Sequence, residues 1–469
     1  MSERTLGITV LADFILSEGC EAIVENLLRV GATAVACNPT VTAPAPEGTG
    51  TFQPPADAGS SPRLFDRKLF GKRALWVQSA PSYLPQAEFY GETVYGPRKV
   101  KDLTHLHGEL VGHFVEMAQA AGLKVYFQLG ACQPSGLRDE DRPCQPDGSI
   151  AAERMADTGC LASAAVRGYN SAYVKDLLAA YPAIDGFRID WPEYPCYTMG
   201  EVFHDFSPHV LRWAGAGGLD FASIQECVRR LYDHLHGRLT NDQLSATGEF
   251  GLADGLANLT GVENPAVRHW LALKARLSVE LVTDWHRALQ QAGRPDLKLT
   301  AHGFMPPYST LTGLDFSNVT AHCHSVSPKF YTMHWPLMVK FWSDWLIERN
   351  PSLERANVVR TVAGWMELGS ARQIEDRLER YRYPRPDEEH PVPISVQRRK
   401  LQEVRDQIPE KTAAFVPLVH GYGPPRDFEN RFRVVAEADV DGVWINRYGY
   451  LGDEKLSAVA EVWKECQQK

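Results

Sequence analysis

Two carboxylates stand three residues apart: Asp190 ends a short, largely apolar segment, residues 186–190, and Glu193 follows it. The prolines at 192 and 195 lack a backbone donor, so a strand that begins in this segment cannot continue past them. In an α/β barrel, catalytic groups gather at the carboxyl ends of the strands. Cleavage of a glycosidic bond requires a pair of carboxylates in such a place. We therefore expect Asp190 to be a nucleophile or stabilising carboxylate and Glu193 to be the general acid.

The neighbours of this pair suit the two roles. Arg188 and Asp190 are two residues apart and share one face of the strand, which should be the barrel interior or mouth. Arg188 would then help to keep Asp190 ionised, and both Arg188 and Trp191 are expected to bind substrate. The rings of Trp191 and Tyr194 should surround Glu193 and raise its pKa, as a proton donor needs.

The rest of the chain must position these groups, and its pattern predicts an α/β fold, a (β/α)8 TIM barrel. Short apolar segments alternate with amphipathic helical ones, which implies parallel strands, and eight such units imply a closed barrel. The expected strands are Gly7–Phe14, Ala34–Asn38, Lys124–Leu129, Gly186–Asp190, Lys298–His302, Val319–Ser325, Ala413–His420 and Gly442–Asn446.

A barrel of this kind takes about 250 residues, so the remainder must be insertions. We expect one domain, 1–469, with loop insertions at 39–100 and 195–265 covering the barrel mouth. Loops that follow the strands tolerate such insertions, since they run over the surface.

Polar residues recur where the other predicted strands end, and burial would be costly for so many of them unless they form a site. Aromatic residues follow several of the same strands, and sugar rings pack on aromatic planes while their hydroxyls need polar partners. The expected substrate-binding residues are Asp13, Asn38, Gln128, Arg188, Trp191, Tyr194, His302, His324, Tyr331, His420, Asn446 and Arg447.

Composition limits the partners and the compartment. A net charge of -9 argues against a nucleic-acid binder, and no apolar run is long enough to span a membrane. The amino terminus lacks the pattern of a signal peptide. Nine cysteines without metal-binding spacing fit reduced thiols in a cytoplasm. A carbohydrate is the expected partner, no cofactor or metal is expected, and a homo-oligomer stays open.

The segment around Asp190 resembles known glycoside hydrolases. Asp185, Gly186 and the residues from Asp190 to Pro195 are similar to the fourth-strand motif of the family 18 chitinases, with Pro192 as an insertion and Arg188 in place of the middle aspartate. Residues 186–190, Gly-Phe-Arg-Ile-Asp, resemble the α-amylase family without a gap, and this resemblance implies that Asp190 is a nucleophile. The Asp-x-x-Glu spacing is similar to that of family 31 α-glucosidases. Residues 181–186 resemble uncharacterised bacterial glycosyl hydrolase barrels.

Two other readings of the same barrel stay open. His302, His322, His324 and His420, with Asp13, Asp190 or Glu193, could form a mixed nitrogen and oxygen metal site of a sugar isomerase, epimerase or lyase. Alternatively, the chain is a sugar-binding barrel without catalysis, since His302 and His420 stand where the α-amylase family has carboxylates on its fifth and seventh strands.

Overall fold

The computed structural model describes residues 4–56, 64–261, 263–370, 373–410 and 412–468. Its central feature is a closed parallel barrel, in the strand order β1-β2-β6-β7-β8-β9-β11-β12 and back to β1. A short strand, β10, shares the position of β11, so nine strands fill eight places around the barrel. The strands are β1 (Thr5–Thr9), β2 (Ala34–Cys37), β6 (Lys124–Gly130), β7 (Gly186–Asp190), β8 (Lys298–Phe304), β9 (Ser325–Phe330), β10 (Ala414–Phe415), β11 (Leu418–His420) and β12 (Gly442–Asn446).

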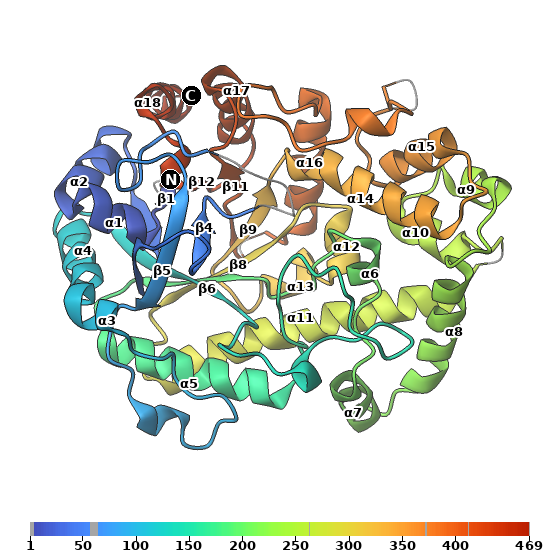
Figure 1. Ribbon diagram of the computed structural model, residues 1–469, viewed down its shortest axis with the longest axis horizontal. Helices are drawn as coiled ribbons and strands as arrows, with labels where there is room; N and C mark the ends of the chain where they lie inside the picture. Colours follow the sequence, from blue (N-terminus) through green and yellow to red (C-terminus); the bar gives the residue numbers. More distant parts are fainter. Residues whose placement is uncertain (1–3, 57–63, 262, 371–372, 411, 469) are drawn as a thin grey trace.

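Helices surround the barrel, as Figure 1 shows. Those that follow barrel strands are α1 (Ala12–Glu18), α2 (Cys20–Arg29), α3 (Asp102–His107), α4 (Glu109–Ala120), α5 (Ala164–Ala180), α11 (Pro265–Gln291), α12 (Tyr308–Thr312), α13 (Phe316–Val319), α14 (His334–Arg349), α15 (Arg355–Trp365), α16 (Ile394–Gln407), α17 (Pro425–Ala436) and α18 (Asp453–Gln467). The predicted (β/α)8 architecture is confirmed.

Local signals explain where the long helices begin. The Ser163 side chain accepts a hydrogen bond from the backbone of Val166 and caps α5, and Asn264 caps α11 in the same way, one residue before Pro265. Both are favoured N-terminal arrangements, because they satisfy a free backbone donor or remove it. The two long helices lie side by side along one flank of the barrel (Figure 1).

Two of the eight predicted strands lie at the wrong residues. The first strand ends at Thr9, and Asp13 belongs to helix α1. The sixth strand begins at Ser325, where we expected it to end, because Val319 closes helix α13. The true strand was concealed by Pro328 and Lys329, which are both poor strand formers.

The first insertion forms a small antiparallel sheet beside the barrel, in the order β3-β5-β4, from β3 (Thr40–Pro44), β4 (Thr51–Gln53) and β5 (Leu75–Pro81). A buried carboxylate, Asp176 of α5, anchors the insertion by accepting hydrogen bonds from the Tyr83 and Tyr90 hydroxyls at 3.0 and 2.9 Å. Residues 57–63 of this insertion lie outside the described residues.

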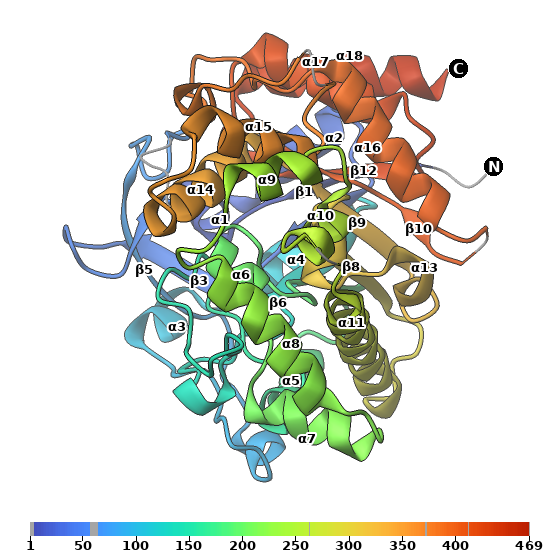
Figure 2. The ribbon, with the colours of Figure 1, turned by 90° about the vertical axis from the view of Figure 1, so that its right-hand side faces the viewer.

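The insertion after β7 carries five helices, α6 (Met199–Val202), α7 (Pro208–Ala216), α8 (Phe221–His234), α9 (Asn241–Thr247) and α10 (Leu252–Asn258). They gather on one side of the molecule, which faces the viewer in Figure 2. The first residues of this insertion contact the segments that follow β8 and β9. The Tyr194 backbone donates to the Thr312 carbonyl, and the Tyr197 hydroxyl lies 3.0 Å from His334 Nδ1. That the two insertions cover the mouth stays a prediction.

Among the described residues, no helix combines the length and the apolar character that a bilayer crossing requires.

Candidate active site

An ion pair lies at the carboxyl end of β7. Lys329 Nζ of β9 is 2.7 Å from Asp190 Oδ1, and the Asp190 side chain is 26% exposed while that of Lys329 is 4% exposed. Burial alone would raise the pKa of Asp190, but the charge of Lys329, aided by His302, outweighs it and holds that pKa well below its usual range. Asp190 is therefore an ionised carboxylate that solvent can reach.

Lys329 is the residue that sequence reasoning missed. Its ammonium lies over the Trp191 ring, 3.6 Å from the ring centre, and 5.1 Å from that of Phe304. Trp191 itself has a φ of 61°, in the left-handed region that costs a bulky residue energy. With β9 in its true register, the lysine would have been found, since the side chains of residues 325, 327 and 329 share one face.

Arg188 and His302 lie inside the barrel, as the alternation along their strands predicts. The Arg188 guanidinium stacks on Trp444 of β12, 3.6 Å from the ring centre, and its Nη2 donates to Ser327 Oγ at 3.2 Å. His302 Nδ1 is 3.8 Å from Asp190 Oδ1. Burial lowers the pKa of Arg188 to about 9 and that of His302 to about 4, so at neutral pH the arginine is charged and the imidazole is neutral.

Glu193 is not exposed at the carboxyl end of the barrel, as the expected role of general acid would require. The residue is fully buried, and its oxygens accept hydrogen bonds from the Phe304 backbone, at 2.8 Å, and from the Thr312 hydroxyl. Burial raises the pKa of Glu193 to about 7. Tyr194 is also buried, with its hydroxyl donating to Asp205 Oδ2 at 2.9 Å, and therefore does not line the mouth. The hydrogen bonds of both residues fix the loop after β7 to neighbouring segments of the chain.

Other predicted residues meet between strand ends, Asn446 and Tyr331 across the intervening β11, and Asn38 and Gln128 between the neighbouring strands β2 and β6. The Asn446 side chain donates to the Tyr331 hydroxyl at 2.7 Å, and the Asn38 side chain donates to the backbone carbonyl of Gln128 at 2.7 Å. These residues are partly exposed except Asn446, which is 6% exposed. They lie at or just after the carboxyl ends of the strands β2, β6, β9 and β12.

Three further predicted residues come from the loops or ends of β1, β11 and β12. Burial raises the pKa of Asp13 to about 6, while the charge of Arg447 acts to lower it. The His420 ring lies 5.0 Å from the Tyr331 ring and 5.2 Å from the Tyr450 ring, in a cluster of aromatic side chains.

The prediction that His324 lies at the mouth is wrong. Because β9 begins at Ser325, His324 precedes the strand and lies at the opposite end of the barrel, where its Nδ1 accepts a hydrogen bond from the Leu299 backbone at 3.1 Å. The metal-site alternative loses its ligand set for the same reason, since His322 also precedes the strand. Within the described ranges, no group of three His, Cys, Asp or Glu residues is placed to hold a metal ion.

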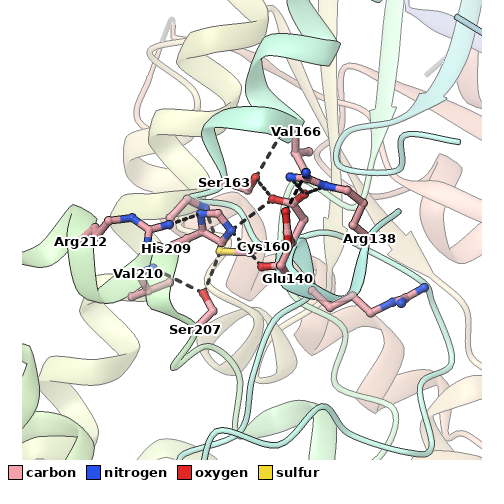
Figure 3. Close-up of polar contacts among 12 residues, drawn as sticks. Arg138, Glu140, Cys160, Ser163, Val166, Ser207, His209, Val210 and Arg212 are labelled. Atoms are coloured by element: carbon pink, nitrogen blue, oxygen red, sulfur yellow. Dashed lines mark hydrogen bonds and ion pairs between the residues drawn. The ribbon is translucent and has the colours of Figure 1, made fainter. Parts of the chain in front are cut away.

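A second polar cluster, away from the strand ends, contains serine, histidine and cysteine side chains (Figure 3). Its centre is Asp141, fully buried, which accepts hydrogen bonds from Ser163 at 2.5 Å and from Arg138 at 2.6 Å, and lies 3.2 Å from His209 Nε2. Cys160 is buried, and burial raises the pKa of its thiol well above the ordinary value. The Ser163 hydroxyl donates to the Asp141 carboxylate and not to the imidazole, so the cluster joins the loop after β6 to the insertion after β7 and is not a nucleophilic site.

Comparison with known proteins finds similarity of shape alone. No protein-family profile and no curated protein sequence matches this chain. Among solved structures, a β-galactosidase from the psychrophilic Marinomonas ef1 is 10% identical with a TM-score of 0.49, over 99% of this chain and 59% of that one. The catalytic domain of a β-amylase from Paenibacillus polymyxa is 8% identical, with a TM-score of 0.45 over 98% of each chain. A chitinase from Chromobacterium violaceum is 8% identical, with a TM-score of 0.39 over 98% of each chain. These structures are named for glycoside hydrolases, and similarity this distant carries no argument about the substrate of this chain.

Proposed function

We propose that this protein is a glycoside hydrolase that cleaves the O-glycosidic bonds of small glycosides or oligosaccharides, with Asp190 as its nucleophile or stabilising carboxylate. The observation that carries the proposal is the ionised, partly exposed carboxylate of Asp190 at a strand end, next to the partly exposed ring of Trp191. A fixed negative charge supports the oxocarbenium-like transition state, and an aromatic ring packs against a sugar.

The acid must come from a carboxyl group that still holds its proton near neutral pH. Glu193 has a suitable pKa, but the protein groups bonded to both of its oxygens support a positioning role for it. Asp13 is 2% exposed, follows β1 in the first turn of α1 at the carboxyl end of the barrel, and has a pKa raised to about 6, so a fraction of the molecules keeps this proton at neutral pH. We assign the role of general acid to Asp13 and the role of fixing the loop after β8 to Glu193.

Leaving-group dependence separates these roles. Asp190→Asn should lower kcat on every hydrolysed 4-nitrophenyl glycoside by roughly 10²-fold or more. Asp13→Asn should show a similar loss on alkyl glycosides but a much smaller one on 2,4-dinitrophenyl glycosides, whose leaving group needs no proton. Full activity of Asp190→Asn would refute the proposal, and an equal loss on both leaving groups would refute the role of Asp13.

The compartment is part of the proposal. All nine cysteines lie in the described part of the chain, where none is paired in a disulfide, and seven of them are buried, which supports a reducing compartment such as the cytoplasm.

A further inference from the structure

Three buried side chains that carry nitrogen, two of them cationic and one neutral, lie beneath and beside Asp190. Arg188, His302 and Lys329 come from the adjacent strands β7, β8 and β9 and are 0%, 0% and 4% exposed. The alternation of each strand directs them to the barrel interior, on the side of the mouth where Asp190 lies. They form one group, because the charges of Arg188 and Lys329 both act on His302.

Several nitrogen atoms of this group lack the partners that burial demands. Within the described part of the chain, Nε and Nη1 of Arg188 and both ring nitrogens of His302 have no hydrogen-bond partner. A buried donor left unpaired costs about 1–3 kcal/mol, and more for a charged group. Native proteins rarely carry several such atoms at one place unless something else binds them.

The charges of these side chains are also unbalanced, with an excess of positive charge. Arg188 and Lys329 are two buried cations, and Asp190 supplies one full negative charge opposite them. Glu193, with a pKa near 7, adds partial negative charge at neutral pH. An oxocarbenium-like transition state would bring a further positive charge into this surplus, which raises the barrier. Bound water could satisfy the free donors, but it could not offset the charge.

We infer that the substrate itself supplies the missing negative charge: the enzyme acts on glycosides of an acidic sugar, whose anionic group lies near Asp190 at the carboxyl end of the barrel, where the buried cations Lys329 and Arg188 attract it, with His302 beside them. The inference rests on the proposed glycosidase function, and it names the substrate class. A uronic acid carboxylate and a sugar phosphate share this chemistry, and charged donors bind either strongly.

Binding to the wild-type protein tests the inference directly. Calorimetric titration would compare matched pairs that differ in the anionic group: glucuronate with glucose, galacturonate with galactose, and glucose 6-phosphate with glucose. At least one acidic sugar should bind 10-fold or more tightly than its neutral partner. The pair that shows this preference identifies the anionic group of the substrate as a carboxylate or a phosphate. Equal affinities within every pair would overturn the inference.

Variants then link the preference to the named residues. Arg188→Met replaces the buried cation with an apolar side chain of similar length, and it should reduce the acid-to-neutral affinity ratio about 10-fold. Arg188→Lys keeps the charge and should preserve most of the ratio. Should Arg188→Met fail to fold, His302→Gln provides the second variant, with a reduced ratio expected. An unchanged ratio in the folded variants would overturn the assignment.

Turnover separates this inference from the function on which it rests. The corresponding nitrophenyl glycosides should be hydrolysed in the same order of preference, and Asp190→Asn should abolish hydrolysis while binding the acidic sugar at least as tightly as the wild type. Binding preference without hydrolysis of any glycoside would uphold the anionic site and refute the glycosidase. Hydrolysis confined to neutral glycosides would uphold the glycosidase and refute the substrate class.

Discussion

In the ion pair of Asp190 and Lys329, the charge of each side chain stabilises the ionised form of the other. Replacing Lys329 with Met removes the main cause of the low pKa of Asp190 and leaves a largely enclosed carboxylate without its counter-charge. We expect the acid limb of the pH profile of kcat/KM to move to higher pH and kcat to fall by about 10-fold or more. A pH profile measured from pH 3 to 9 checks this shift.

The cost in stability of the same change should depend on Asp190. Removing one partner of a buried pair costs up to about 3–5 kcal/mol, and the partial exposure of Asp190 places this pair below that range. In the double variant Lys329→Met, Asp190→Asn, most of that cost should disappear, because no charge is left unpaired. Additive losses in urea unfolding would show that the two side chains act independently.

Glu193 makes stability depend on pH in a defined direction. Its pKa in the folded protein, about 7, lies above the ordinary value of 4.5. Its stabilising contribution is therefore complete below pH 4.5 and is lost as the pH rises through 7. Glu193→Gln removes this loss, so the unfolding free energy of the variant relative to the wild type should rise by roughly 3 kcal/mol between pH 4 and pH 8. Urea unfolding at several pH values measures it, with Glu249→Gln at an exposed position as control. An unchanged difference would mean that the pKa of Glu193 is the same in the folded and the unfolded protein.

At the scale of the elements, close packing of β1 and β12 supports the site from below. A Cβ added at Gly7 of β1 would lie 2.4 Å from the Trp444 ring, the same ring on which Arg188 stacks. Gly7→Ala should therefore cost about 1–3 kcal/mol of stability and displace that ring. Thermal unfolding measures the cost, and a changed tryptophan emission reports the displaced ring.

Helix α5 provides the control for this change. Gly168 lies in its interior with no atom within 4 Å of an added Cβ, so Gly168→Ala should stabilise the protein by roughly 0.5–1 kcal/mol. A loss at both glycines would point to a general effect of the added methyl group, and no loss at Gly7 would mean that Trp444 has room to move.

At the scale of the whole molecule, the packing of the barrel protects most of the thiols. Seven of the nine cysteines are buried, and Cys144 and Cys227 are partly exposed. A thiol reagent such as Ellman's reagent should modify at most these two in the native protein and all nine after unfolding. Rapid modification of more than two thiols in the native state would mean that the helices around the barrel open readily.

The sequence by itself determined the architecture and the central carboxylate. Alternating apolar strands and amphipathic helices can be satisfied only by a parallel sheet with helices outside it, and the Arg188 to Asp190 alternation correctly directed both side chains inward. These features are local or periodic, so they can be recognised along the chain without knowledge of distant contacts.

Only the tertiary structure decided which partners surround Asp190. Lys329 was concealed because a strand containing Pro328 and Lys329 is favoured by its place in the barrel and not by its own composition. The same error of register placed His324 at the mouth, since a shift of a few residues moves a side chain from one end of the barrel to the other. Glu193 is enclosed for a related reason: its oxygens are satisfied by Phe304 and Thr312, more than one hundred residues away along the chain. Charge, burial and proton affinity at this site arise from contacts between distant segments, and no local pattern encodes them.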